Sequence, residues 1–120
     1  MKRDPHLVRA LLLHYEAKEN DRVDSCPHIP EYTPLEVGYH LILLYEAGFI
    51  RAEPELTKTG RIIKVHPFSL TWNGHEFLEA ARNESAWNKA MKKVGSATGA
   101  LSFSVLQALL ISYAKQSVGI

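Results

Sequence analysis

Cysteine is almost absent from this sequence. Its 120 residues include one, Cys26, which cannot close a disulfide within the chain, so a reducing compartment is favoured. Long apolar runs are missing too: the most apolar segment, residues 100–114, is shorter than the roughly 20 apolar residues of a membrane span. Asp4 and Arg9 interrupt the apolar start of the chain, and no small-residue cleavage site follows, unlike in a signal peptide. We therefore expect a cytoplasmic protein with no membrane partner.

The sequence also lacks a charge bias. The formal net charge is +1, so no global field draws the chain to nucleic acid, and such binding would need a local basic patch. Apolar residues make up 46% and charged residues 22%, which is typical of a globular protein. The length fits a single domain. Within it we expect a core over residues 1–95 and a C-terminal helix over residues 96–120 that packs on the core or on a second subunit.

The common signatures of catalysis and metal binding are missing as well. There is no glycine-rich phosphate loop, no nucleophile elbow and no paired-carboxylate motif. Cys26 and His28 form "CPH", but a structural zinc site needs four ligands, usually as two close pairs, and no second pair exists. His40 and Trp87 fit core positions better than site positions. We expect no enzyme activity, no metal and no cofactor.

What is present begins with two well-marked helices. Asp4 is a suitable N-cap before Pro5, and apolar residues at helical spacing predict a first helix over residues 4–20 with a buried stripe. That stripe consists of Val8, Leu11, Leu12 and Tyr15. A proline-rich loop follows, with a short extended piece near residues 22–24. Thr33 and Glu36 form a capping box for a helix over residues 33–47, which Gly48 ends.

A hairpin and an abrupt strand-to-helix junction come next. Residues 50–56 and 61–72 are β-rich and predict two strands with residues 58–60 at the tip, while Pro54 and Pro67 indicate edge strands. In "LTWNGHEFLEAAR", residues 70–82, Asn73 is the expected N-cap of the next helix. Trp72 and Phe77 then have the spacing of a hydrophobic staple, which predicts a buried Trp72 packed on Phe77.

Two further helices are predicted at the C-terminus. Ser85 is the expected cap of a helix over residues 86–94, and Ser102 of a last helix over residues 103–117 that Gly119 ends. Leu101 is placed to staple onto Leu106. The last helix carries a broad apolar face, which must be buried in the same chain or against a second copy. We favour a homodimer.

Two motifs in this order carry a resemblance. "VGYHLILLYEAGFI" resembles the third helix of a winged-helix domain entering its first wing strand, and "LTWNGHEFL" resembles the second wing strand entering the next helix. Together with "MKRDPHLVRALLL" and "LSFSVLQALLISYAK", they resemble a family of short prophage and bacterial proteins catalogued as a domain of unknown function. The resemblance implies a phage-linked setting and an α+β winged-helix fold with a hairpin wing and extra C-terminal helices. The helix-turn-helix is truncated, because a proline-rich loop replaces its second helix.

The helix over residues 33–47 does not look like a base-reading helix. It contains no Arg or Lys, whereas helices that read DNA present basic or amide side chains to the base edges. Apolar residues lie on two faces, which predicts burial on both, under the C-terminal helix or another subunit. The expected interface comprises Leu35, Tyr39, Ile42 and Leu43 of this helix and Val105, Leu106, Leu109 and Tyr113 of the last one.

Basic residues gather at two other places, the hairpin and the helix after Trp87. They could contact phosphates without reading sequence, or could be ordinary solvated surface. These candidate nucleic-acid contacts are Lys58, Arg61, Lys64, Lys89, Lys92 and Lys93. The sequence thus predicts a non-enzymatic interaction module, either a phage-linked nucleic-acid-binding regulator or a protein-binding or dimerisation scaffold without nucleic-acid binding.

Overall fold

The computed structural model of the chain describes residues 1–96 and 103–117. In these residues the fold is α+β, with five helices and one two-stranded antiparallel sheet. The chain divides into two compact units, Met1–His75 and Glu76–Ile120. The elements are α1 (Pro5–Glu16), α2 (Pro34–Glu46), β1 (Ile50–Leu56), β2 (Ile62–Leu70), α3 (Trp72–Ala81), α4 (Glu84–Ser96) and α5 (Phe103–Ser117).

The first helix begins where the sequence predicts and ends earlier. The Asp4 carboxylate accepts hydrogen bonds from the backbone N–H groups of His6 and Leu7, which satisfies donors that the helix itself leaves unpaired. α1 ends at Glu16 instead of continuing to Asn20, because the Asn20 side chain accepts the backbone N–H of Arg22 and forms a turn there. The predicted stripe of α1 is buried.

The second helix has the predicted boundaries. Thr33 and Glu36 exchange the two hydrogen bonds of a capping box. After the helix, Gly48 has φ of 74°, a backbone conformation that costs glycine little and other residues more. Residues 17–33 between α1 and α2 contain no helix, which confirms the predicted loop over residues 21–32.

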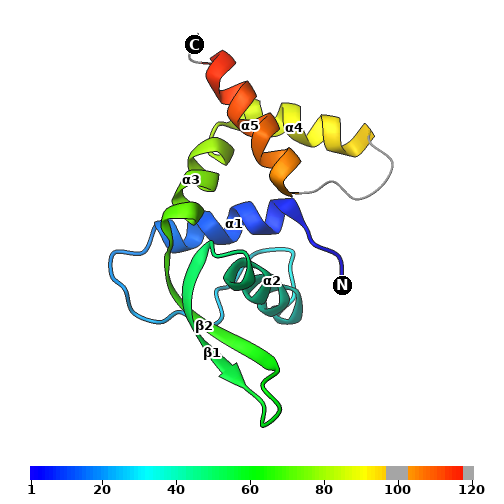
Figure 1. Cartoon of the computed structure of the whole chain (residues 1–120). Coiled ribbons are helices and arrows are strands. Elements are labelled where there is room, and N and C mark those ends of the chain that lie inside the picture. The colour runs from blue at the N-terminus through cyan, green and yellow to red at the C-terminus, as the bar shows by residue number, and fades with distance from the viewer. Residues whose placement is uncertain (97–102, 118–120) are drawn as a thin grey trace. The chain divides into compact units, whose positions relative to one another are not determined.

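The hairpin also forms as predicted, with residues 57–61 between its strands. Ile50 pairs with Leu70 at its base, and Leu56 pairs with Ile62 near its tip. The loop after α1 lies along the outer edge of β2, where the Asp24 N–H donates to the Pro67 carbonyl at 2.8 Å. In Figure 1 the hairpin extends away from α1 and α2.

The core of the Met1–His75 unit lies where both helices meet the base of the hairpin, because α1 and α2 each pack against β2 and against one another. Its buried side chains come from every element of the unit. They include Leu7, Val8, Leu11, Leu12 and Tyr15 of α1, Val37, Leu41 and Leu44 of α2, and Ile50, Val65 and Leu70 of the hairpin.

The predicted staple at the strand-to-helix junction is wrong. Trp72 is 75% exposed, while Phe77 is fully buried and stacks on Phe103 with ring centroids 5.8 Å apart. The reason is that Thr71, not Asn73, caps α3: its hydroxyl accepts the Gly74 N–H at 3.1 Å, and its carbonyl accepts the His75 N–H. Trp72 is therefore the first residue of the helix rather than the residue before the cap.

Thr71 also joins α3 to the turn after α2. Its N–H donates to the Phe49 carbonyl at 3.0 Å, and its hydroxyl donates to the Gly48 carbonyl. The backbone of α3 approaches this turn so closely that a side chain at Gly74 has no room. A Cβ there would lie 2.0 Å from the Phe49 carbonyl oxygen.

The Glu76–Ile120 unit contains the rest of α3 with α4 and α5. Asn83 caps α4, because its side chain accepts the Ala86 N–H at 2.9 Å, so the prediction that Ser85 is the cap is wrong. α4 and α5 pack together, and Trp87, Leu106 and Leu110 are buried. The predicted roles of Leu101, Ser102 and Gly119 concern positions outside the described residues.

The close approach at Gly74 predicts opposite effects for two glycine substitutions. Gly74→Ala should lower the free energy of unfolding by about 2–3 kcal/mol, because backbone atoms must move to admit the methyl group. Gly38→Ala should raise it by about 0.5–1 kcal/mol, because a Cβ in this part of α2 meets no atom within 4 Å and alanine favours the helix. Denaturant unfolding followed by circular dichroism measures both. Equal stability of the two variants would contradict the close approach.

Candidate interaction groove

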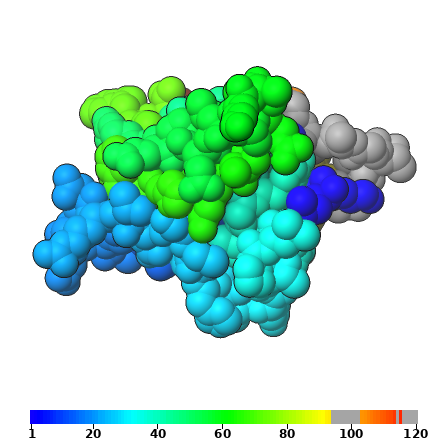
Figure 2. Space-filling view, turned by 90° about the horizontal axis from the view of Figure 1, so that it is seen from below, coloured from blue at the N-terminus to red at the C-terminus, as the bar shows by residue number. Residues whose placement is uncertain are grey.

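A groove lies between the outer face of α2 and strand β2. It has a volume of about 480 Å³, within the range of ligand-binding clefts. Apolar side chains line most of it. We call it the α2–hairpin groove and define it by Leu35, Tyr39 and Ile42 of α2, Ile63 and Val65 of β2, Lys64 at its border, and Ser25 and Cys26 of the loop before α2. Figure 2 shows this side of the Met1–His75 unit, with the hairpin in green and the start of α2 in cyan.

The groove exists because α2 is apolar on two faces. Val37, Leu41 and Leu44 point into the core, and the opposite side of the helix carries the groove residues. Leu35 is 70% exposed, so the prediction that both faces are buried is wrong for this residue within one chain. Tyr39, Ile42 and Leu43 are half-buried. Leu35 and Ile63, which is 45% exposed, thus place apolar surface in solvent on both sides of the groove.

The charges around the groove are mixed rather than basic. On the hairpin, Lys58, Arg61 and Lys64 are exposed, but Glu53 and Glu55 lie on the neighbouring strand, and Glu55 is directly opposite Lys64. A Glu55 carboxylate oxygen lies 3.3 Å from His66 Nε2, and Lys64 makes no ion pair with a described residue. Among the described residues that line the groove, Lys64 is the one with a charged side chain.

The other predicted site residues belong to the Glu76–Ile120 unit. Lys89, Lys92 and Lys93 are exposed on α4, and the Lys89 ammonium lies 5.9 Å from the centre of the Tyr113 ring. On α5, Val105 is exposed, Leu109 and Tyr113 are half-buried, and Leu106 is 1% exposed. Leu106 therefore belongs to the core of this unit and is not available to a partner.

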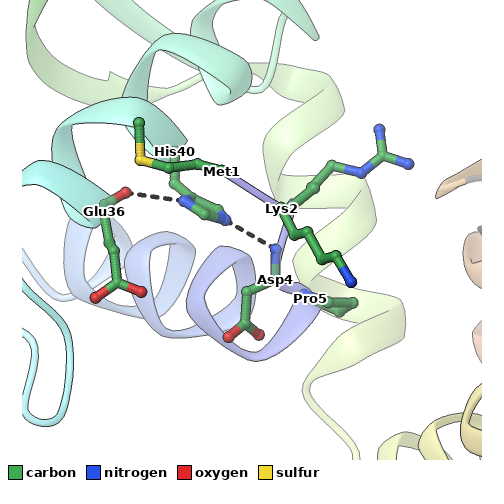
Figure 3. Close-up of a pocket in the computed structure, with 7 residues that line it drawn as sticks. Met1, Lys2, Asp4, Pro5, Glu36 and His40 are labelled. Atoms are coloured by element: carbon green, nitrogen blue, oxygen red, sulfur yellow. Dashed lines mark hydrogen bonds between the residues drawn. The ribbon is translucent and has the colours of Figure 1, made fainter.

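A second hollow, of about 390 Å³, lies where the chain enters α1, and it has a structural explanation. His40 is 2% exposed, which confirms that it is a core histidine. Its Nε2 accepts the Asp4 N–H at 2.8 Å, so its Nδ1 carries the proton and donates to the Glu36 carbonyl at 2.8 Å (Figure 3). Both ring nitrogens are occupied by backbone groups. This histidine fixes the start of α1 to α2 and is not free to act as a base.

Sequence reasoning missed a chain of hydrogen bonds beside the groove. The Ser25 hydroxyl lies 2.6 Å from His66 Nδ1, and His66 Nε2 lies 3.3 Å from a Glu55 carboxylate oxygen. No sequence motif indicates these contacts, because the three residues come from a loop and two different strands. A second pair, His14 and Asp24, approaches to 2.6 Å nearby and helps to hold the loop.

Two further kinds of site are absent from the described residues. No three His, Cys, Asp or Glu side chains in residues 1–96 and 103–117 come together as metal ligands. In the same part of the chain, no helix has both the length and the apolar character needed to cross a membrane.

Comparisons with known proteins place the chain in a family. Residues 2–100 match the family described as hypothetical protein (DUF2513), and the chain belongs to that family. It is 32% identical over 110 residues to an uncharacterized protein of Haemophilus influenzae, and the match covers 89% of this chain and 90% of that protein. No solved structure matches.

Tyr32 beside the second hollow allows a test at alkaline pH. Burial, and then the 2.8 Å hydrogen bond to the Asp4 carboxylate, raise the pKa of Tyr32 from 10.0 to about 12. Because the folded state favours the protonated phenol, this stabilisation is complete below pH 10 and disappears as the pH rises through about 12. Tyr32→Phe should therefore cost about 1 kcal/mol at pH 8 and almost nothing near pH 12.

Urea unfolding of both proteins between pH 8 and pH 12 measures this difference. Burial raises the pKa of Tyr15 as well, but both proteins keep that residue, so its effect cancels. A cost of Tyr32→Phe that stays constant over the range would contradict the assigned hydrogen bond.

Proposed function

We propose that this protein is a winged-helix interaction module that binds another protein through the α2–hairpin groove. In this organisation α2 occupies the place of the recognition helix and the hairpin that of the wing. The observation that carries the proposal is the apolar, exposed surface between them. A large exposed apolar surface is a common mark of a protein-binding site.

The chemistry of α2 argues against base reading. Its outward side chains include Leu35, Tyr39 and Ile42, none of which offers the bidentate hydrogen bonds that distinguish base pairs. Binding through phosphate contacts alone would depend on the hairpin. There the negative charges of Glu53 and Glu55 offset the positive charges of the basic residues. An apolar groove with one border cation therefore fits a protein surface better than a phosphate backbone.

The groove favours one kind of partner, an amphipathic helix. Such helices place side chains three and four residues apart into apolar grooves. Leu35, Tyr39 and Ile42 form a matching row along α2. Lys64 at the border makes no ion pair with a described residue and would complement an acidic residue beside the apolar stripe. We therefore propose an amphipathic helix with acidic flanking residues as the occupant.

A designed peptide tests this proposal. A fluorescently labelled amphipathic helix with a leucine stripe flanked by glutamates should bind, and the same peptide with flanking lysines should bind more weakly. Leu35→Glu should weaken binding of the glutamate peptide at least about tenfold, because it places a charge where the leucine stripe docks. Fluorescence anisotropy titration measures the affinities.

Leu56→Glu is the matched control. Leu56 is an exposed leucine of the hairpin that borders the groove, but it does not line the groove. This change should therefore leave peptide affinity unaltered. An equal loss of peptide affinity in Leu35→Glu and Leu56→Glu would contradict docking in the groove. Equal affinity for the glutamate and lysine peptides would contradict it as well.

Nucleic-acid binding is the competing function, and exposed Lys58, Arg61 and Lys64 on one hairpin are the observation that favours it. Under our proposal, duplex DNA shows no mobility shift at physiological salt, with the native protein or with all three residues changed to alanine. A shift that weakens with salt, and loses part of that salt dependence in the triple variant, would instead assign phosphate contacts to the hairpin. The corresponding triple variant of Lys89, Lys92 and Lys93 tests α4 separately.

A second copy of this chain could also occupy the groove, and the homodimer expected from the sequence remains a proposal. Sedimentation velocity of the native chain and of the Leu35→Glu variant distinguishes a partner helix from a second copy of the chain as the occupant. A dimer that Leu35→Glu dissociates would mean that the partner is another copy.

A further inference from the structure

A loop residue and two strand residues form a continuous hydrogen-bonded chain at the border of the α2–hairpin groove. Ser25 comes from the loop before α2, His66 from β2 and Glu55 from β1. Ser25 itself lines the groove and is half-buried.

The direction of these hydrogen bonds follows from the chemistry of the three groups. An ionised carboxylate can only accept hydrogen bonds, so His66 Nε2 carries the proton that faces Glu55. In the neutral ring, Nδ1 is then an acceptor, and the Ser25 hydroxyl donates its proton to Nδ1 across 2.6 Å. A serine hydroxyl that donates to a histidine held by a carboxylate is the arrangement that activates serine as a nucleophile.

The segment that carries Ser25 is held firmly in place. Asp24, the residue before Ser25, makes two hydrogen bonds. Its N–H donates to the Pro67 carbonyl, and its carbonyl accepts the Tyr15 hydroxyl at 2.5 Å. Lys18 joins the same loop to β2, because its ammonium donates to the Phe68 carbonyl at 2.9 Å as well as to the Arg22 carbonyl. The distance from serine to histidine is thus set by the fold and does not depend on a free loop.

We propose that Ser25 is a nucleophile that attacks esters with apolar acyl groups bound in the α2–hairpin groove. His66 is its base, and Glu55 is a positioning residue that sets the tautomer of His66. The proposal goes beyond binding and does not depend on a protein partner. The apolar residues of the groove match an apolar acyl chain, and the groove volume suits a small ligand.

The reaction balances with water as the only co-reactant. Ser25 Oγ forms a bond to the ester carbonyl carbon while its proton moves to His66 Nδ1. The alkoxide leaves with that proton, which releases an alcohol and an acyl-serine. Water then attacks the acyl carbon, gives a proton to the same nitrogen, and releases the acid as the proton returns to Ser25 Oγ. No described backbone carbonyl accepts the N–H groups of Ser25 and Cys26, and in this proposal both groups donate to the developing oxyanion.

Two probes test the proposal, a fluorescent fluorophosphonate and the ester p-nitrophenyl butyrate. The fluorophosphonate should form an adduct on Ser25, identified by mass spectrometry of the digested full chain. The ester should be hydrolysed, with loss of both reactions in Ser25→Ala. His66→Asn should slow adduct formation about 100-fold or more, which is the usual contribution of a general base. Glu55→Ala should slow it less, and Glu55→Asp should recover part of the rate.

Controls separate reactivity from folding. His28→Asn changes an exposed histidine of the same loop that does not line the groove, so this variant should react at the native rate. Circular dichroism melts identify variants that fail to fold. Labelling spread over several serines, or a Ser25 rate unaffected by a folded His66→Asn variant, would overturn the proposal. These readouts do not involve the amphipathic peptide, so protein docking can fail while the serine proves reactive, or the reverse.

Discussion

The hydrogen bonds of Thr71 determine how the Met1–His75 unit closes. This residue caps α3 with its hydroxyl, and it binds the Gly48 and Phe49 carbonyls with its hydroxyl and N–H. The end of α2, the start of β1 and the end of β2 are thereby fixed at one point. Because β2 is fixed at its base, its register with β1 places Ile63 and Val65 beside the outer face of α2. The groove is therefore a consequence of a junction at the opposite end of the strand.

Local signals in the sequence were sufficient for most of the elements. The Thr33 capping box, the Gly48 terminator and the two strands act through neighbouring residues, so their patterns carry the information. The caps of α3 and α4 were misassigned, since several residues in each stretch can cap and local sequence does not choose among them. For α3, the choice of Thr71 follows from its bonds to a distant turn, which cannot be read from residues 70–82.

The site was predictable only in part. The apolar outer face of α2 is visible in its sequence period, but the exposure of Leu35 depends on what the rest of the chain leaves uncovered. The chain of Ser25, His66 and Glu55 was not predictable. Ser25 and His66 are 41 residues apart, and His66 and Glu55 are 11 apart, so the fold brings them together rather than any motif. Predicting the charge balance of the hairpin likewise requires knowledge of the strand register, which places Glu55 opposite Lys64.

The two prolines of the hairpin have a consequence for how the protein behaves in concentrated solution. A two-stranded sheet has two open edges, and unpaired edges can recruit strands from other molecules and start fibrils. Pro54 removes a backbone donor from β1, where Glu53 and Glu55 also add repelling charge. On the other edge, Pro67 has no N–H to offer, and its carbonyl already accepts the Asp24 N–H. Both edges thus resist growth into intermolecular sheets, which allows the chain to expose apolar side chains nearby without inviting amyloid-like assembly.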